Sequence, residues 1–159
     1  MRLPPFQALL DDNRDALWRF LVAHVGPHDA ADCFQETMLS ALRAYPSLRD
    51  GSNLRGWLFT IAHRKVIDLV RARGRQAIPT DEPPEVPSDD RQAMAGVEAN
   101  GDLWPAVRRL PLKQRTAVVA RFVADLPYAD IAVMSGSSEE AARQNVRAGL
   151  ANLRKVVTP

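Results

Sequence analysis

Three polar side chains near the carboxyl end of the chain have the chemistry to read nucleic-acid bases. Arg143, Gln144 and Arg147 fall on one side of a helix, because residues three and four apart share a helical face. In the major groove arginine pairs with guanine and glutamine with adenine. Apolar residues of the same segment recur on the opposite side: Ala142, Val146, Leu150 and Leu153. The pattern predicts a helix that packs through one face and contacts DNA through the other.

A tight turn precedes that helix. Gly136 lies between two serines and can adopt the positive φ that a sharp turn needs, and Ala132 is small where two helices would cross. Ser137 fits the N-cap position, with Glu140 three residues later to complete a capping box. Residues 128–150 therefore predict a helix-turn-helix element, whose second helix enters the major groove. A plain helical hairpin with a solvated polar face has the same pattern.

A second candidate nucleic-acid surface lies upstream. From Arg55 to Arg75 the chain carries six Lys/Arg and one acidic residue. Helical spacing places several of these charges on one face: Arg64, Asp68, Arg71 and Arg75. Such a face fits a phosphate backbone, although a solvated basic helix face gives the same pattern.

Composition narrows the class of protein. The 159 residues are 46% hydrophobic and 25% charged, which is typical of a globular chain. Cys33 is the only cysteine, so no intramolecular disulfide can form and nothing indicates an oxidising compartment. The sequence shows neither a signal peptide nor an apolar run long enough to span a bilayer. These features predict a cytoplasmic protein without direct membrane contact.

Charge divides the chain into three parts. Residues 1–75 carry 11 Lys/Arg and 8 Asp/Glu, residues 76–100 carry 1 and 6, and residues 101–159 carry 9 and 5. The middle part is rich in proline and acid and poor in large apolar residues, so it predicts a flexible linker. We therefore expect a domain on each side of it, each folding separately. Whether the linker is an active element or a passive tether stays open.

Helical periodicity predicts an all-α fold in both domains. Gly26-Pro27 should end the first helix, and Asp29 could cap the second. In the first domain we expect helices at Phe6 to about Val25, Asp29 to Tyr45, Asn53 to Gly56, and Trp57 to about Arg73. In the second domain we expect helices from near Asp102 to Leu110 and from Lys113 to Asp125, before the helix-turn-helix. The predicted core includes Phe34, Met38, Leu42, Tyr45 and Phe122.

Three segments resemble, in the same order, the bacterial sigma factors of the extracytoplasmic-function (ECF) group, or group IV. They are DAADCFQETMLSAL, GWLFTIAHRKVIDLVRARGR and LPLKQRTAVVARFVADLPYADIA. The resemblance covers nearly the whole chain and includes a linker at the matching place. It implies a chain that binds core RNA polymerase, directs it to a two-part promoter and helps to open the duplex, without being an enzyme.

The resemblance also implies roles for residues. Asp32, Gln35 and Glu36 match core-polymerase contacts. The minus-ten element would be melted and bound by residues 52–75, with the candidates Asn53, Arg55, Arg64, Lys65, Arg71 and Arg75. The minus-thirty-five element would be read by the helix-turn-helix, with the candidates Ser138, Glu140, Arg143, Gln144 and Arg147. The implied domains are 1–75 for polymerase and the minus-ten element, 76–100 for the linker and 101–159 for the minus-thirty-five element.

The implied partners are core RNA polymerase, promoter DNA and an anti-sigma factor that holds the chain inactive. No cofactor or metal is implied.

The chain departs from the family pattern at Asp130, where glutamate is frequent, and near Gly149. Glycine inside a helix costs about 1 kcal/mol relative to alanine.

Other classes of protein fit less well. A sigma-like decoy that only sequesters an anti-sigma factor needs no basic face or recognition helix. A stand-alone helix-turn-helix regulator needs a receiver or ligand domain, which residues 1–75 do not resemble. An enzyme lacks support, because the sequence has no glycine-rich phosphate loop and no nucleophile elbow. His24, His28 and Cys33 could be imagined as metal ligands, but Gly26-Pro27 interrupts any helix aligning them and a fourth ligand is missing.

Overall fold

Helices make up the regular structure of the chain. The computed structural model describes residues 3–49, 51–76 and 103–157, and these contain no strand. The elements are α1 (Phe6–Val25), α2 (Pro27–Ala44), a 3-10 turn (Tyr45–Ser47), α3 (Leu54–Gln76), α5 (Leu103–Arg109), α6 (Leu112–Phe122), α7 (Tyr128–Ser135) and α8 (Glu139–Val157). The predicted all-α fold is confirmed. The predicted linker lies outside the described residues, apart from its first residue.

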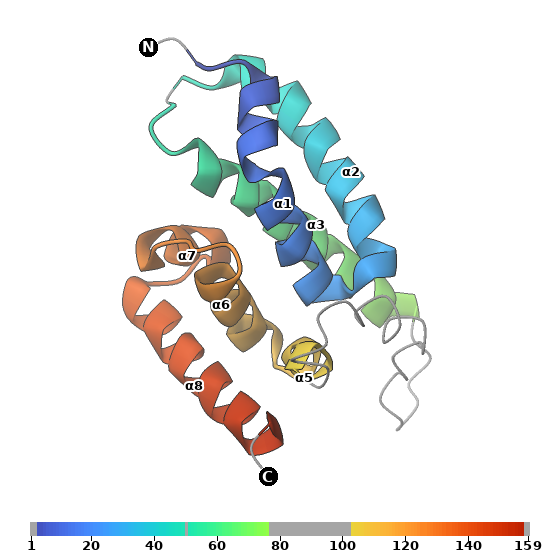
Figure 1. Ribbon diagram of the computed structural model, residues 1–159, viewed down its shortest axis with the longest axis vertical. Coiled ribbons are helices and arrows are strands. Elements are labelled where there is room, and N and C mark those ends of the chain that lie inside the picture. Colours follow the sequence, from blue (N-terminus) through green and yellow to red (C-terminus); the bar gives the residue numbers. More distant parts are fainter. Residues whose placement is uncertain (1–2, 50, 77–102, 158–159) are drawn as a thin grey trace.

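The N-terminal domain is a bundle of α1, α2 and α3, which contact one another pairwise (Figure 1). Its core consists of fully buried side chains from α1 and α3: Leu17, Phe20, Leu21, Leu58, Phe59 and Val66. The rings of Phe20 and Phe59 meet edge to face, with their centroids 5.2 Å apart. This geometry is one that aromatic pairs prefer, so it stabilises the packing of α1 against α3.

The break between α1 and α2 is the predicted one. Gly26 has a φ of 84°, a conformation that glycine adopts without strain, and Pro27 is the first residue of α2. The prediction that Asp29 caps α2 is wrong, because the helix already begins at Pro27. Asp29 lies in the first turn, where its charge suits the helix dipole, and it forms an ion pair with Arg73 of α3.

The start of α3 differs from the predicted pair of segments. A single helix begins at Leu54, because the Oδ1 atom of Asn53 accepts a hydrogen bond from the Gly56 amide at 3.0 Å. A Cβ atom at position 56 would lie 2.7 Å from the Asn53 Nδ2 atom. Glycine at position 56 therefore allows the asparagine to cap the helix.

The C-terminal domain contains α5, α6, α7 and α8, with α6 packed along α8 (Figure 1). The inward residues of α8 are as predicted, since Ala142, Val146 and Leu153 are buried and Leu150 is half-buried. Gly149 is buried against Val118 of α6. The mid-helix glycine is thus placed where the two helices approach closely.

Two residues predicted to lie in the core are exposed. Leu42 is 52% exposed, because the core side of α2 follows small residues, Ala30, Cys33, Thr37 and Ala41. Each step of four residues from Phe34 turns about 40° further around the helix, which carries Leu42 away from the core. Phe122 is 61% exposed at the end of α6, and the fully buried Leu126 fills the core in its place.

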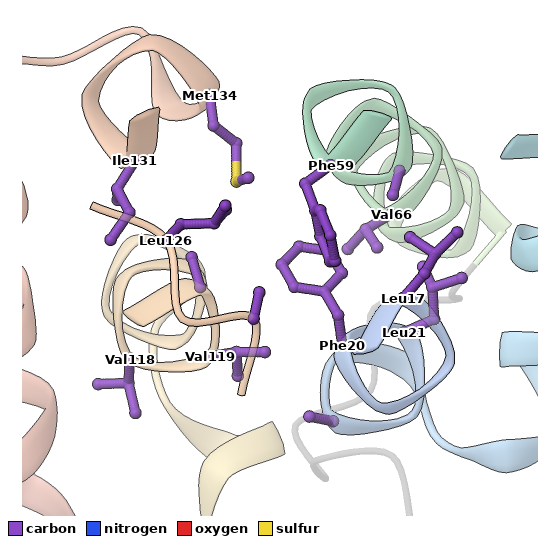
Figure 2. Close-up of a cluster of buried hydrophobic side chains, with 14 of the residues drawn as sticks. Leu17, Phe20, Leu21, Phe59, Val66, Val118, Val119, Leu126, Ile131 and Met134 are labelled. Atoms are coloured by element: carbon purple, nitrogen blue, oxygen red, sulfur yellow. The ribbon is translucent and has the colours of Figure 1, made fainter. Parts of the chain in front are cut away.

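The two domains pack against each other. Helix α1 contacts α5 and α6, and α3 contacts α7. Figure 2 shows the side chains of the two domains facing each other, with Met134 of α7 directed toward Phe59 of α3. Buried residues of both domains form a single hydrophobic cluster. The expectation of two separately folding domains did not include this contact.

Candidate nucleic-acid interface

The turn of the helix-turn-helix confirms the predicted role of Gly136, which ends α7 with a φ of 64° in the left-handed region. The predicted cap is wrong by one residue. The Ser138 hydroxyl, not that of Ser137, accepts the hydrogen bond from the Ala141 amide, at 3.0 Å. Since residue 141 is an alanine, no capping box forms. Ser138 and Glu140 are exposed at the start of α8.

The outer face of α8 carries the predicted base-reading residues. Gln144 and Arg147 are exposed, and Arg143 is half-buried. The Arg143 guanidinium lies 5.0 Å from the ring centroid of Tyr128 and 3.4 Å from a Glu139 carboxylate oxygen. Tyr128 also supports Arg121, at 4.9 Å. Tyr128 was not among the predicted site residues, because its partners come from two other helices.

The basic face of α3 is present in the structure. Arg64 and Arg71 are exposed with Asp68 between them, and Lys65 is half-buried. The side chain of Arg75 lies outside the described part of the chain. These groups form a surface that a phosphate backbone can reach, separate from the face of α3 that carries Phe59 and Val66 in the core.

Asn53 and Arg55 lie apart from that basic face, at the contact between the domains. The Arg55 guanidinium donates to Asn13 Oδ1 at 2.6 Å and to the carbonyl oxygen of Ala124. The Asn53 Nδ2 atom donates to the Asp130 carboxylate at 2.7 Å. These two candidates therefore have protein partners where DNA contacts were predicted.

A candidate protein-binding surface covers the outer side of α2. Asp32, Gln35 and Glu36 are exposed there, as predicted. Leu39 and Leu42 continue the same side and are 45% and 52% exposed. We call these five residues the α2 patch. The two leucines were not among the predicted contact residues, although their spacing of four and seven residues from Gln35 places them on the same helix face. Together the two leucines add apolar area to a polar helix face, and an apolar patch with a polar rim is typical of a binding surface.

Two histidines are buried near the contact between the domains. The His24 Nδ1–H donates to the Phe20 carbonyl oxygen at 3.1 Å, and no hydrogen-bond partner of its Nε2 atom is found among the described residues. The His63 Nε2 atom lies 3.1 Å from the Thr116 hydroxyl. Burial lowers the pKa of His24 to about 3 and the pKa of His63 to about 4. Both side chains are neutral at pH 7.

Among the described residues, no three His, Cys, Asp or Glu side chains lie close enough together to bind a metal ion. Cys33 is buried on α2, and burial, with the nearby Asp29, Glu36 and Asp32, raises its pKa to about 11. A thiol held in its protonated form is a poor metal ligand and nucleophile. Within the described ranges, no helix is long and apolar enough to cross a membrane.

Comparison with known proteins places both domains in one family. Residues 9–76 match Sigma-70 region 2, and residues 101–153 match Sigma-70, region 4. The chain is 30% identical to the ECF RNA polymerase sigma factor SigE of Mycolicibacterium smegmatis over 96% of this chain, and it spans 61% of SigE. It is 33% identical to the ECF RNA polymerase sigma factor ShbA of Streptomyces griseus, over 80% of this chain and 71% of ShbA.

A solved structure has the same arrangement of helices. The sigma factor RpoE of Bartonella quintana, in complex with the anti-sigma factor NepR, superposes with a TM-score of 0.76. The match covers 97% of this chain and 98% of that chain, with 23% identity, so it shows a shared fold. The two family models and the ShbA similarity show that the chain belongs to the ECF RNA polymerase sigma factors.

Proposed function

We propose that this chain is a group IV promoter-specific initiation factor that acts in the cytoplasm with core RNA polymerase and is not itself an enzyme. Residues 1–75 bind polymerase and the minus-ten element, residues 76–100 connect the domains, and residues 101–159 read the minus-thirty-five element. The partners are core RNA polymerase, promoter DNA and an anti-sigma factor. The last of these is supported by the RpoE relative, which was solved with NepR.

The observation that carries the proposal is the recognition face of α8. Gln144 and Arg147 are exposed on it, while Tyr128 of the preceding helix holds the Arg143 guanidinium. A helix that presents donors to base edges from a rigid support suits readout in the major groove. The basic face of α3 and the α2 patch give the chain two further surfaces on different helices, as an initiation factor requires.

Reconstituted transcription tests the proposal. Core RNA polymerase and the purified chain are incubated with a pool of genomic DNA fragments, and the 5′ ends of the transcripts are sequenced. We expect initiation at promoters that share a minus-ten and a minus-thirty-five element. If the chain neither binds core polymerase nor supports initiation on any fragment, the proposal is wrong.

Charge reversal distinguishes an initiation factor from a decoy. The double variant Arg143→Glu, Arg147→Glu should lose promoter use and keep polymerase binding, because both residues lie on α8 and away from the α2 patch. A decoy that only sequesters an anti-sigma factor would be indifferent to these changes. Lys155→Glu, in the last turn of α8, makes the same kind of change far from the recognition face and serves as the control.

A further inference from the structure

The three long polar side chains on the outer part of α8 do not have equal freedom. Arg143 is half-buried, and its guanidinium lies 5.0 Å from the ring centroid of Tyr128 and 3.4 Å from a Glu139 carboxylate oxygen. Gln144 and Arg147 are exposed, and within the described part of the chain neither side chain has a hydrogen bond, an ion pair or a ring contact. The structure therefore separates one held side chain from two free ones.

The three residues also differ in their position around α8. Successive residues of an α-helix are turned by about 100°, so Gln144 and Arg147 lie about 60° apart. The exposed residues Glu140 and Ala151 fall in the same sector, and these four residues form the outermost stripe of the helix. Arg143 lies about 100° from Gln144, on the flank of α8 that faces α7.

That flank is the side of the DNA backbone. In a helix-turn-helix the second helix lies in the major groove, while the first helix crosses the backbone. Tyr128 is the first residue of α7, so its ring holds the Arg143 guanidinium beside the strand that α7 crosses. The contact with Glu139 leaves the guanidinium available, because the two side chains are 43% and 51% exposed and such pairs are weak. A phosphate oxygen can replace this carboxylate.

The two free side chains have hydrogen-bonding groups that suit different bases. Glutamine forms two hydrogen bonds with the N6 and N7 atoms of adenine, and arginine forms two with the O6 and N7 atoms of guanine. Gln144 and Arg147 are about 4.5 Å apart along the helix axis, and successive base pairs are about 3.4 Å apart along the duplex. The two bases should therefore lie in adjacent base pairs, or in pairs with a single pair between them.

We propose that Gln144 and Arg147 set the sequence preference for the minus-thirty-five element through one adenine and one guanine, and that Arg143 binds the backbone and reads no base. The inference rests on the proposed function, since it divides roles within the helix assigned to that element. Tyr128 is then a positioning residue, because it acts on DNA through Arg143. If all three side chains read bases, the loss of Arg143 would remove a preference at a third position.

A promoter library with a randomised minus-thirty-five region tests this division. The minus-ten element is kept constant and comes from a promoter that the genomic pool identifies, and sequencing of the transcripts measures initiation by the chain with core RNA polymerase. Arg143→Met and Arg147→Met are a matched pair, since each replaces a guanidinium with a neutral side chain on the same helix. Arg154→Met makes the same change in the last turn of α8 and is the control.

We expect the wild type to prefer one adenine and one guanine by about five- to 150-fold over the other bases. Gln144→Ala should abolish the adenine preference alone, and Arg147→Met should abolish the guanine preference alone. Arg143→Met should lower initiation several-fold on all library members and keep both preferences within about twofold of the wild type. Arg154→Met should keep both preferences.

The inference is overturned if Arg143→Met changes nothing or abolishes the preference at one position, or if Gln144→Ala or Arg147→Met lowers all members alike. A wild type that initiates from the library without any base preference also overturns it. If circular dichroism shows that Arg143→Met does not fold, Tyr128→Leu takes its place. That variant should lower all members alike, and an unchanged or position-specific profile overturns the inference. Failure of the proposed function is a separate result, since the wild type then initiates on no genomic fragment.

Discussion

Gly149 of α8 lies so close to Val118 of α6 that a Cβ atom on the glycine would be 2.6 Å from the valine Cγ2 atom. Real Cβ contacts are longer than this. The two helices can therefore lie this close together only because residue 149 has no side chain. The glycine that looked unfavourable for α8 on propensity grounds sets the spacing of the helix pair that carries the recognition face.

Gly149→Ala should therefore lower the stability of the C-terminal domain, although alanine is the better helix former. We expect a loss of about 1–3 kcal/mol, the usual range for overpacking a core, measured by urea denaturation. Gly74→Ala is the matched control, because nothing lies within 4 Å of a Cβ at that helical position, and it should stabilise the chain by up to about 1 kcal/mol. In the double variant Gly149→Ala, Val118→Ala, part of the lost unfolding free energy should be restored, because the smaller side chain at position 118 leaves room for the new methyl group. An unchanged midpoint for Gly149→Ala would contradict the close approach.

The ring of Tyr128 should matter for DNA binding, although it was not a candidate contact. Tyr128→Leu removes the ring on which Arg143 rests, and we expect duplex affinity to fall about two- to fivefold, since exposed cation–π contacts are worth about 0.5–1 kcal/mol. Tyr128→Phe keeps the ring and should bind like the wild type. Equal affinities of the Leu and Phe variants in a gel-shift titration would show that Arg143 does not depend on this support.

The leucines of the α2 patch should contribute to polymerase affinity. Leu39→Ala and Leu42→Ala remove exposed apolar surface, so folding stability should change by less than about 0.5 kcal/mol, which is usual for surface sites. We expect each change to weaken binding to core polymerase several-fold, measured by surface plasmon resonance. Val133→Ala removes an exposed apolar side chain outside the patch and is the control. If Leu39→Ala and Leu42→Ala bind core polymerase as tightly as Val133→Ala does, the leucines of the α2 patch do not contribute to that affinity.

Acid should weaken the interdomain contact. Burial lowers the pKa of His24 to about 3 and of His63 to about 4, and opening returns both toward the ordinary value of 6.5. The charged and titratable groups around His24 are His63 on α3 and Arg115 on α6, and Arg108 of α5 acts on Arg115. Above about pH 6.5 both histidines are neutral in either form, so the contact has its full stability. As the pH falls from 6.5 toward 4, the open form takes up protons that the closed form excludes.

Each histidine that becomes solvated on opening should lower the stability of the contact by about 1.4 kcal/mol per pH unit in that window. The radius of gyration should therefore rise between pH 7 and pH 5, while circular dichroism shows that the helices persist. His63→Gln removes one titrating group and should flatten the dependence, and His28→Gln, at an exposed position, should leave it unchanged. A radius that is constant over this range would contradict the prediction.

Much of the fold could be predicted from the sequence, because local patterns set it. Gly26-Pro27 marked a helix end, and Gly136 marked the turn of the helix-turn-helix, since each residue has its own backbone preference. Positions that depend on fine geometry were less predictable. Ser137 and Ser138 both suit an N-cap, and only the backbone hydrogen bond to Ser138 decides between them.

The interdomain contact could not be predicted in the same way. Arg55 and Asn53 look like any polar residues at a helix start, and their partners Ala124 and Asp130 are 69 and 77 residues away in the sequence. Met134 follows the ordinary pattern of an apolar residue on a short helix. No local spacing distinguishes a side chain that packs inside its own domain from one that packs against the other.

Asn53 has a further property that follows from its two hydrogen bonds. Its Oδ1 atom caps α3 by accepting from Gly56, and its Nδ2 atom donates to Asp130. When the domains separate, the cap persists, because both of its atoms belong to the N-terminal domain. The amide therefore stays in one rotamer with its donor directed outward. By the same geometry, Asn53 is a preorganised hydrogen-bond donor for any acceptor that takes the place of Asp130.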